Sequence, residues 1–206
     1  EARFWYTEEL KSRNFLLRGS IAVTMTLIGA LLTALVIARE WERGTMETLL
    51  VTRISVFELL AGKLIPYFVL GMAGFFISLA MAYLLFDVPI RGSLVLLLAV
   101  SALFLLVALG MGLAISTVFR SQFVAALVSL VVTFLPAFLL SGFIFDIRSM
   151  PLIIQTITRL IAARYYVSML QTLFLVGNVG SILLINSLYL LAMALFFLGL
   201  TYLKTG

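Results

Sequence analysis

Five long apolar runs that contain no charged residue constrain the fold of this chain more than any other feature. They occupy residues 19–38, 64–86, 93–117, 123–145 and 181–203. At a helical rise of about 1.5 Å per residue, each run can cross a hydrocarbon layer about 30 Å thick. Residues 94–98 and 103–109 are apolar at every position, whereas a barrel strand alternates apolar with polar residues. The sequence therefore predicts an all-α, polytopic membrane helical bundle with five spans in this chain.

The composition excludes most catalytic chemistries. The 206 residues include no Cys and no His, and only 11% of them are charged. The chain therefore lacks thiolate nucleophiles, the commonest metal ligand and the usual proton carrier at neutral pH. We predict no catalytic residue, no metal ligand and no cofactor in this chain. The net charge of +5 comes from loops beside the apolar runs, which favours a lipid bilayer over nucleic acid as the partner.

Small residues recur at every fourth position of the first run. They are Ala22, Thr26, Ala30 and Ala34, followed by Ala38. Such a stripe gives a flat helix surface on which another helix can pack closely. It is typical both of a mobile contact between two copies of the protein and of packing within one bundle, and the sequence leaves the two open. Ala108, Gly112 and Ser116 repeat the pattern in the third run.

The fourth run contains residues that weaken a helix. Pro136 lies near its middle, where the missing N–H and the ring should kink or break the backbone, and Ser141 and Gly142 weaken the helix further. A bent helix at this place can gate a transport pathway or merely shape the packing. We therefore take Pro136, Ser141 and Gly142 as pathway candidates, together with the stripe of the first run.

Residues 147–178 are too apolar for a free loop and too short for two spans. Residues 150–161 have the spacing of an amphipathic helix, and a second helical run covers residues 165–176. We predict a helical hairpin that lies in the membrane interface. Tyr165 and Tyr166 either anchor it among the lipid headgroups or line an exit for an amphipathic substrate.

The loop of residues 39–63 carries the densest charge pattern of the chain. Its candidate docking residues are Arg39, Glu40, Glu42, Arg43, Gly44, Thr45, Met46, Glu47, Leu49 and Leu50. Gly44 can end one helix, and the Thr45 hydroxyl can cap the next, which should begin near Met46. The apolar face of that helix can seat in a groove of a partner protein. Alternatively, the loop is a solvated turn held by internal pairs: Arg39 with Glu42, Glu40 with Arg43, and Arg43 with Glu47.

The same loop carries a resemblance to a known family. Residues 39–47 (REWERGTME) and 58–63 (ELLAGK) are similar to the signature of type-2 ABC transporter permeases of the drug-efflux kind. Further similarity runs through residues 9–16, 122–125, 134–137, 140–145 and 163–166, so it covers essentially the whole chain. The chain departs from the pattern at Arg18, Arg53 and Ala162, where a proline is usual.

The resemblance implies an arrangement that the residues alone leave open. Loop 39–63 would be a cytoplasmic coupling segment that docks on an ATP-binding subunit, which would hold the ATP and Mg. Residues 19–206 would form an ABC-type transmembrane domain in the bacterial cytoplasmic (inner) membrane, with hairpin 147–178 on the outer side. A second permease copy or a related permease would complete a dimer. Residues 1–18 would end an extracytoplasmic region, with a sixth span expected before Glu1.

The absence of charged residues within the five runs bears on the energy source. Proton-coupled carriers and ion pumps need charged or titratable groups at membrane depth. This absence indicates an energy source outside the bilayer. Together with the resemblance, it implies a permease subunit of an ATP-driven exporter for hydrophobic or amphipathic compounds, drugs or lipid-like molecules, with ATP hydrolysis in a separate partner. A passive channel or facilitator, and a membrane scaffold that recruits a cytoplasmic protein, remain the alternatives.

Overall fold

The regular secondary structure of this protein is helical throughout the part that the structure describes. A computed structural model describes residues 19–45, 56–84, 92–142 and 147–205, and no strand occurs within these ranges. In them, five helices are long and apolar enough to cross a membrane: Gly19–Glu42, Phe57–Leu84, Leu94–Val118, Gln122–Leu140 and Gly180–Lys204. The predicted all-α bundle with five spans is confirmed.

Two of the spans are interrupted by π-helical turns in the described residues. The first span consists of helix 19–26, the π-helical turn η1 (Leu27–Leu32) and α2 (Thr33–Glu42). The fourth consists of α6 (Gln122–Ser129), the π-helical turn η2 (Leu130–Phe134) and α7 (Leu135–Leu140). The remaining elements are α4 (Val56–Leu84), α5 (Leu94–Val118), η3 (Ile147–Ser149), α8 (Leu152–Thr158), α9 (Ala162–Leu175) and α10 (Gly180–Thr205).

The first two spans are longer than the apolar runs, because the helices continue into the charged residues beside those runs. The first helix runs past Ala38 to Glu42, and α4 begins at Val56, before the predicted residue 64. Charged side chains at a helix end reach water, so they do not stop the helix. The fourth span ends earlier than predicted: α7 stops at Leu140, and Gly142 has a φ of 84°. This left-handed conformation is one that glycine adopts without the strain of a Cβ atom.

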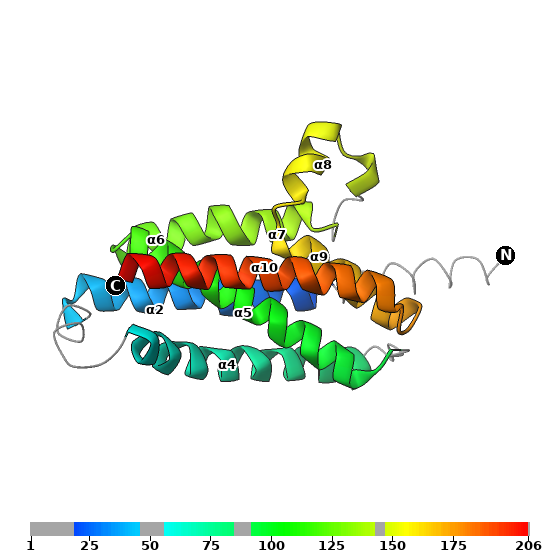
Figure 1. The fold of residues 1–206 in the computed structure, drawn as a ribbon, viewed down its shortest axis with the longest axis horizontal. Coiled ribbons are helices and arrows are strands. Elements are labelled where there is room, and N and C mark those ends of the chain that lie inside the picture. Colours follow the sequence, from blue (N-terminus) through cyan, green and yellow to red (C-terminus); the bar gives the residue numbers. More distant parts are fainter. Residues whose placement is uncertain (1–18, 46–55, 85–91, 143–146, 206) are drawn as a thin grey trace.

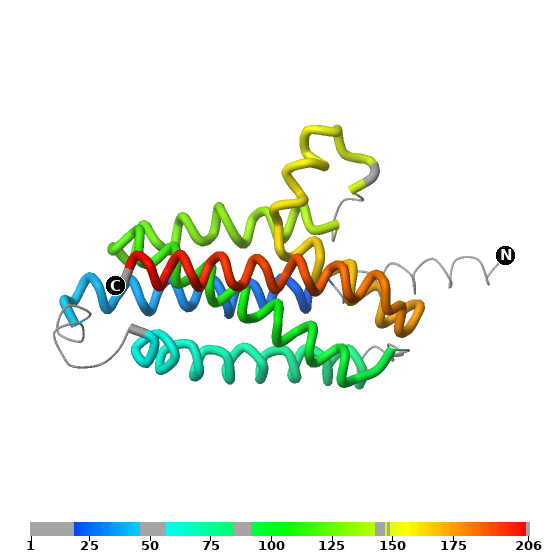
Figure 2. The backbone as a smooth tube through the Cα atoms, viewed as in Figure 1, coloured from blue at the N-terminus to red at the C-terminus, as the bar shows by residue number. Residues whose placement is uncertain are grey.

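Helix α5 lies at the centre of the bundle. Figure 2 shows the first span (blue) and α10 (red) running alongside α5 (green), which contacts both, as well as α4, α6 and α9. Half of the most apolar segment of α5 is buried, against 17% for α4 and for α10. The outer faces of α4 and α10 instead expose large apolar side chains such as Phe76 and Phe196. Lipid can solvate these faces, since the bilayer is itself apolar.

The first span packs against α5 through backbone contact. A Cβ atom at Gly112 would lie 2.5 Å from the carbonyl oxygen of Ala30, and one at Gly29 would lie 2.6 Å from the Cβ of Ala108. The stripe predicted on the first span is buried as a whole: Ala22, Thr26, Ala30, Ala34 and Ala38. Because the chain's own helices cover it, packing within one bundle describes this stripe, and a contact between two copies does not.

Helix α9 lies inside the bundle and not at its surface. Tyr166 is fully buried and stacks on Phe104, with ring centroids 4.3 Å apart. Its hydroxyl hydrogen-bonds the Ser101 hydroxyl at 2.8 Å and donates to the Met25 sulfur at 3.2 Å. Burial raises the pKa of the Tyr166 phenol, which keeps the group neutral. The prediction that Tyr166 anchors in the headgroups or lines an exit is therefore wrong, because its hydroxyl is satisfied inside the protein.

Helix α8 stands apart from the five spans, as Figure 1 shows at the top of the view. Three bonds hold it to α9. The Arg164 guanidinium donates to the Gln155 carbonyl at 3.2 Å and to the Thr158 hydroxyl, and the Tyr165 hydroxyl donates to the Arg159 carbonyl at 2.8 Å. The predicted pair of short helices is present, but α9 packs inside the bundle, and only the location of α8 in the membrane interface stays a prediction.

Replacing Gly112 with leucine tests the backbone contact between α5 and the first span. We expect Gly112→Leu to destabilise the protein by about 1–3 kcal/mol, because the added side chain meets the Ala30 backbone and overpacks the bundle. The thermal unfolding midpoint of the detergent-purified protein measures this. Gly199→Leu in α10 is the matched control, since a Cβ there meets nothing within 4 Å. Equal unfolding midpoints for the two variants would contradict the packing scheme.

Candidate functional site

The first candidate region is the loop base, defined here as residues 39–45 and 56–63. Helix α2 ends at the predicted place: Gly44 has a φ of 71°, and its N–H donates to the Trp41 carbonyl at 3.1 Å. The Thr45 hydroxyl donates back to the Glu40 carbonyl at 3.0 Å. The last carbonyls of a helix lack partners within it, so this hydroxyl satisfies one of them. Thr45 therefore completes α2, and the next helix, which the sequence predicted it to cap, lies outside the described residues.

One ion pair closes the loop base. The Glu40 carboxylate pairs with the Lys63 ammonium group, and these side chains are 34% and 12% exposed. Within the described ranges, the predicted pair of Glu40 with Arg43 does not form, and neither does that of Arg39 with Glu42. The pair joins α2 to α4 where water is partly excluded, and screening is weaker there than at the surface. The side chains of Arg39, Glu42 and Arg43 are exposed.

A cation–π contact joins the loop base to the turn between α5 and α6. The guanidinium carbon of Arg120 lies 4.5 Å from the centre of the Trp41 ring. Below it, an apolar cluster of Ile37, Leu59, Leu60 and Leu113 connects α2, α4 and α5. Figure 1 shows these helix ends, together with the end of α10, at the left of the bundle. The loop base is thus continuous with the packed spans. Met46, Glu47, Leu49 and Leu50, the predicted ridge and its acidic neighbour, lie outside the described residues.

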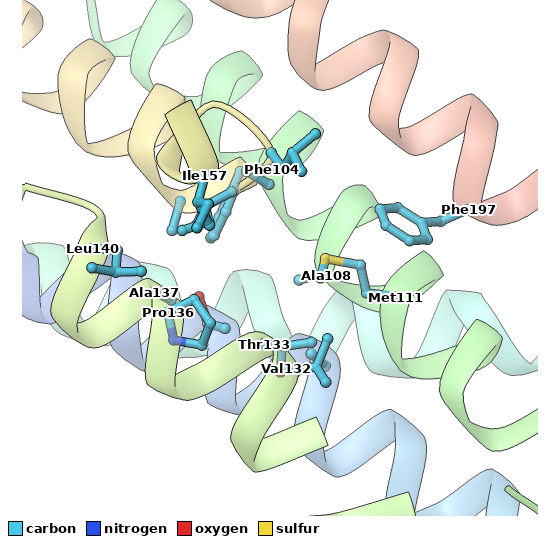
Figure 3. A pocket seen from close by; sticks show the side chains of 16 residues that line it. Phe104, Ala108, Met111, Val132, Thr133, Pro136, Ala137, Leu140, Ile157 and Phe197 are labelled. Carbon is cyan, nitrogen blue, oxygen red and sulfur yellow. The ribbon is translucent and has the colours of Figure 1, made fainter. Parts of the chain in front are cut away.

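The second candidate region is a cavity of about 280 Å³ between the spans. Side chains from the first span, α5, the fourth span, α8, α9 and α10 line it, and Figure 3 shows several of them around the open space. They include Thr26, Ala30, Phe104, Met111, Pro136 and Phe197. Of the predicted pathway residues, the cavity therefore brings together Thr26, Ala30 and Pro136.

The other predicted pathway residues lie away from this cavity. Ala22 and Ala34 are buried on the first span but do not line it. Ser141 is 2% exposed at the end of α7, and its hydroxyl finds no hydrogen-bond partner among the residues that the structure describes. Gly142 follows it in the left-handed conformation. Both residues end the fourth span beside the cavity residue Leu140.

The proline explains the irregular backbone beside the cavity. Pro136 is the second residue of α7, which directly follows η2. The Leu135 N–H donates to the carbonyl of Leu130, five residues back, in the π-helical pattern. The Thr133 hydroxyl donates to the Ser129 carbonyl. A proline ring crowds the preceding turn of a helix, and a wider turn relieves this clash. The sequence predicted a kink or break at Pro136, whereas the helix continues from Gln122 to Leu140 with a π-helical turn before the proline.

The cavity carries no charge and offers no free hydroxyl. All residues that line it are uncharged. The Thr26 hydroxyl donates to the Ala22 carbonyl at 2.8 Å, and that of Thr133 is used on its own helix as well. Among the residues that the structure describes, no three acidic side chains come together as metal ligands would. The arrangement can hold an apolar group, and it can change shape if the first and fourth spans shift.

Comparison with known proteins identifies the family. The model of the ABC-2 family of transporter proteins matches residues 4–203. The chain is 52% identical over 205 residues to a protein of Escherichia coli K12 named probable multidrug ABC transporter permease YbhS, and the match covers 100% of the chain and 54% of that protein. No solved structure matches the chain.

Two other Escherichia coli K12 proteins are also similar. YbhR, likewise named a probable multidrug ABC transporter permease, is 30% identical over 173 residues, which are 84% of the chain and 47% of YbhR. The inner membrane transport permease YhhJ is 32% identical over 160 residues, 77% of the chain and 42% of YhhJ. The chain thus spans about half the length of these relatives. The family match and these identities show that the chain belongs to the ABC-2 family of transporters, as a multi-pass permease segment.

Proposed function

We propose that this chain is the membrane-spanning part of a permease that exports hydrophobic or amphipathic compounds across the bacterial cytoplasmic membrane with energy from ATP. One observation carries the proposal: the first span runs as one helix, with the π-helical turn η1 inside it, from the exposed charges at Arg39 to the cavity residues Thr26 and Ala30. A movement at the loop base can therefore reach the cavity along a single helix.

The distribution of charge supports an energy source outside the bilayer. In the described part of the five spans, charged residues occur only near the helix ends of the loop base and at the end of α10: Arg39, Glu40, Glu42, Glu58, Lys63 and Lys204. Ion-coupled transport requires charged groups deeper in the membrane. We infer that an ATP-binding subunit, which holds ATP and Mg, docks on the exposed side chains of the loop base. The ridge of Met46, Leu49 and Leu50 would supply the apolar part of that contact.

The contacts of the loop base define how force would reach the pathway. A push on the loop base acts on α2 directly, on α4 through the Glu40–Lys63 pair, and on the α5–α6 turn through Trp41 and Arg120. Within the membrane, η1 contacts η2. A tilt of the first span therefore shifts the fourth span at its irregular turn. Rigid helices that move against one another in this way are a common form of switching.

The cargo follows from the chemistry of the pathway. The cavity is uncharged and apolar, so a bare ion would find no ligands in it. Two relatives are named probable multidrug ABC transporter permeases, which agrees with apolar or amphipathic cargo. A second permease copy or a related permease would complete the transporter. A passive facilitator would conduct without nucleotide, and a scaffold would recruit its partner without transport.

The exposed charges of the loop base provide the first test. We expect the double variant Arg39→Glu, Arg43→Glu to lower the amount of ATP-binding subunit that co-purifies by about tenfold, which corresponds to about 1.4 kcal/mol, because two attractive contacts become repulsive. Co-purification and ATP hydrolysis are measured on the full-length permease produced with the ATPase encoded beside it. Lys204→Glu, an exposed charge reversal at the same end of the bundle, is the control and should bind normally. Full co-purification with the double variant would contradict docking on these two charges.

The Glu40–Lys63 pair gives a second prediction. Glu40→Lys and Lys63→Glu should each destabilise the protein by about 1–3 kcal/mol, less than for a fully buried pair because Glu40 is partly exposed. Each should also reduce the ATP hydrolysis that the permease stimulates. The exchange of both residues restores opposite charges across the loop base, so the double variant should regain most of both properties. If it behaves like the sum of the single variants, the pair does not hold the loop base.

A further inference from the structure

We infer that the cavity between the two π-helical turns is a binding site for an uncharged hydrocarbon group, supplied either by a free apolar molecule or by the acyl chain of a lipid. The inference deepens the proposed function, on which it rests for the role of the site, while the binding itself requires neither nucleotide nor transport. It rests on the size, the chemistry and the borders of the cavity.

The volume of the cavity exceeds that of a packing defect. The cavity measures about 280 Å³. An engineered apolar cavity of about 150 Å³ in another protein is large enough to bind benzene. Protein interiors contain few voids larger than a water molecule, since side chains otherwise interdigitate. The cavity therefore has room for a group of roughly two aromatic rings.

The chemistry of the lining selects an apolar ligand. Phe104, Met111 and Phe197 supply aromatic and thioether surface. The hydroxyls of Thr26 and Thr133 donate to carbonyls of their own helices. A charged or strongly polar ligand would lose its hydration and gain little in return, which costs free energy. A hydrocarbon group has no hydration to lose, since it passes from lipid into a site that is also apolar.

Two π-helical turns border the cavity, and hydrogen bonds fix a third border, near α8, to α9. Ala30 of η1 and Thr133 of η2 line it, and π-helical turns occur frequently at functional sites. Ile157 of α8, together with Leu160 and Ile161 after it, forms a roof, which the bonds of Arg164 fix to α9.

The cavity also reaches the protein surface. Three of its lining residues, Val132, Ile157 and Leu160, are 53%, 49% and 78% exposed. They belong to the fourth span and to the roof. We place the mouth of the site at these residues, where a ligand can enter from the surrounding lipid.

Photolabelling tests the site in the full-length permease, reconstituted in lipid nanodiscs without nucleotide. The probe is 3-trifluoromethyl-3-(m-iodophenyl)diazirine, an uncharged apolar molecule that labels nearby residues on illumination. We expect labelling of Phe104 and Met111 that an excess of unlabelled naphthalene reduces about tenfold, because the two apolar molecules compete for the same site. Phe76 on the outer face of α4 faces lipid and should be labelled without competition.

Two variants that fill the cavity make the test specific. Ala137→Phe and Ala162→Leu enlarge buried lining residues and should each abolish the competed labelling. Ala192→Phe, on the exposed face of α10, is the matched control and should leave it unchanged. If one filled variant fails to fold, the other carries the test. Labelling of Phe104 that no competitor reduces, or that persists in the folded filled variants, would overturn the proposal.

A second arm distinguishes the two sources of the ligand. A phospholipid with a diazirine at the end of one acyl chain replaces the small probe. Competed labelling of Met111 by this lipid assigns the site to an acyl chain, and labelling by the small probe alone assigns it to free apolar molecules. Labelling by neither probe overturns the proposal. If no ATP-binding subunit co-purifies with the full-length permease but the competed labelling is intact, the proposed function is rejected and the binding site stands.

Discussion

The close approach of α5 to the first span is the contact on which the rest of the structure depends. In a bilayer, lipid tails are as apolar as the side chains, so the hydrophobic effect does not hold helices together and close packing must do so. Gly112 lets α5 meet the backbone of the first span at Ala30. This contact places η1 beside η2 and leaves the cavity between them. On its other sides α5 receives Tyr166 of α9 and the long helix α10.

The same contact joins two properties that a transporter must combine. The first span carries exposed charge at one end and part of the uncharged cavity wall at η1, so one helix connects the loop base to the cavity. The fourth span lines the cavity with the second π-helical turn, η2, and α7 begins after it at Leu135. The two π-helical turns contact each other, which gives a defined place where a shift of one span can change the shape of the cavity.

Much of this architecture could be predicted from the sequence, because it depends on local composition. The five spans follow from charge-free runs, the end of α2 from Gly44, and the irregular turn of the fourth span from Pro136. The rest depends on contacts between residues far apart in the chain. Glu40 has basic neighbours in sequence but pairs with Lys63, and Tyr166 looked interfacial because its partners Ser101 and Phe104 lie on another helix. The π-helical turn η1 contains no proline that would predict it from the sequence.

The most direct test of the account is site-specific crosslinking from the loop base in native membranes. Residues 1–206 contain no cysteine, so each substitution introduces the single thiol of this segment. Thr45→Cys places it at the loop base, and Asn178→Cys places it in the connection before α10. The account predicts that a thiol-specific crosslinker joins position 45, but not position 178, to the ATP-binding subunit, with a yield that changes when ATP is added. Crosslinking from position 178 instead, or no crosslink from position 45 in the assembled transporter, would contradict it.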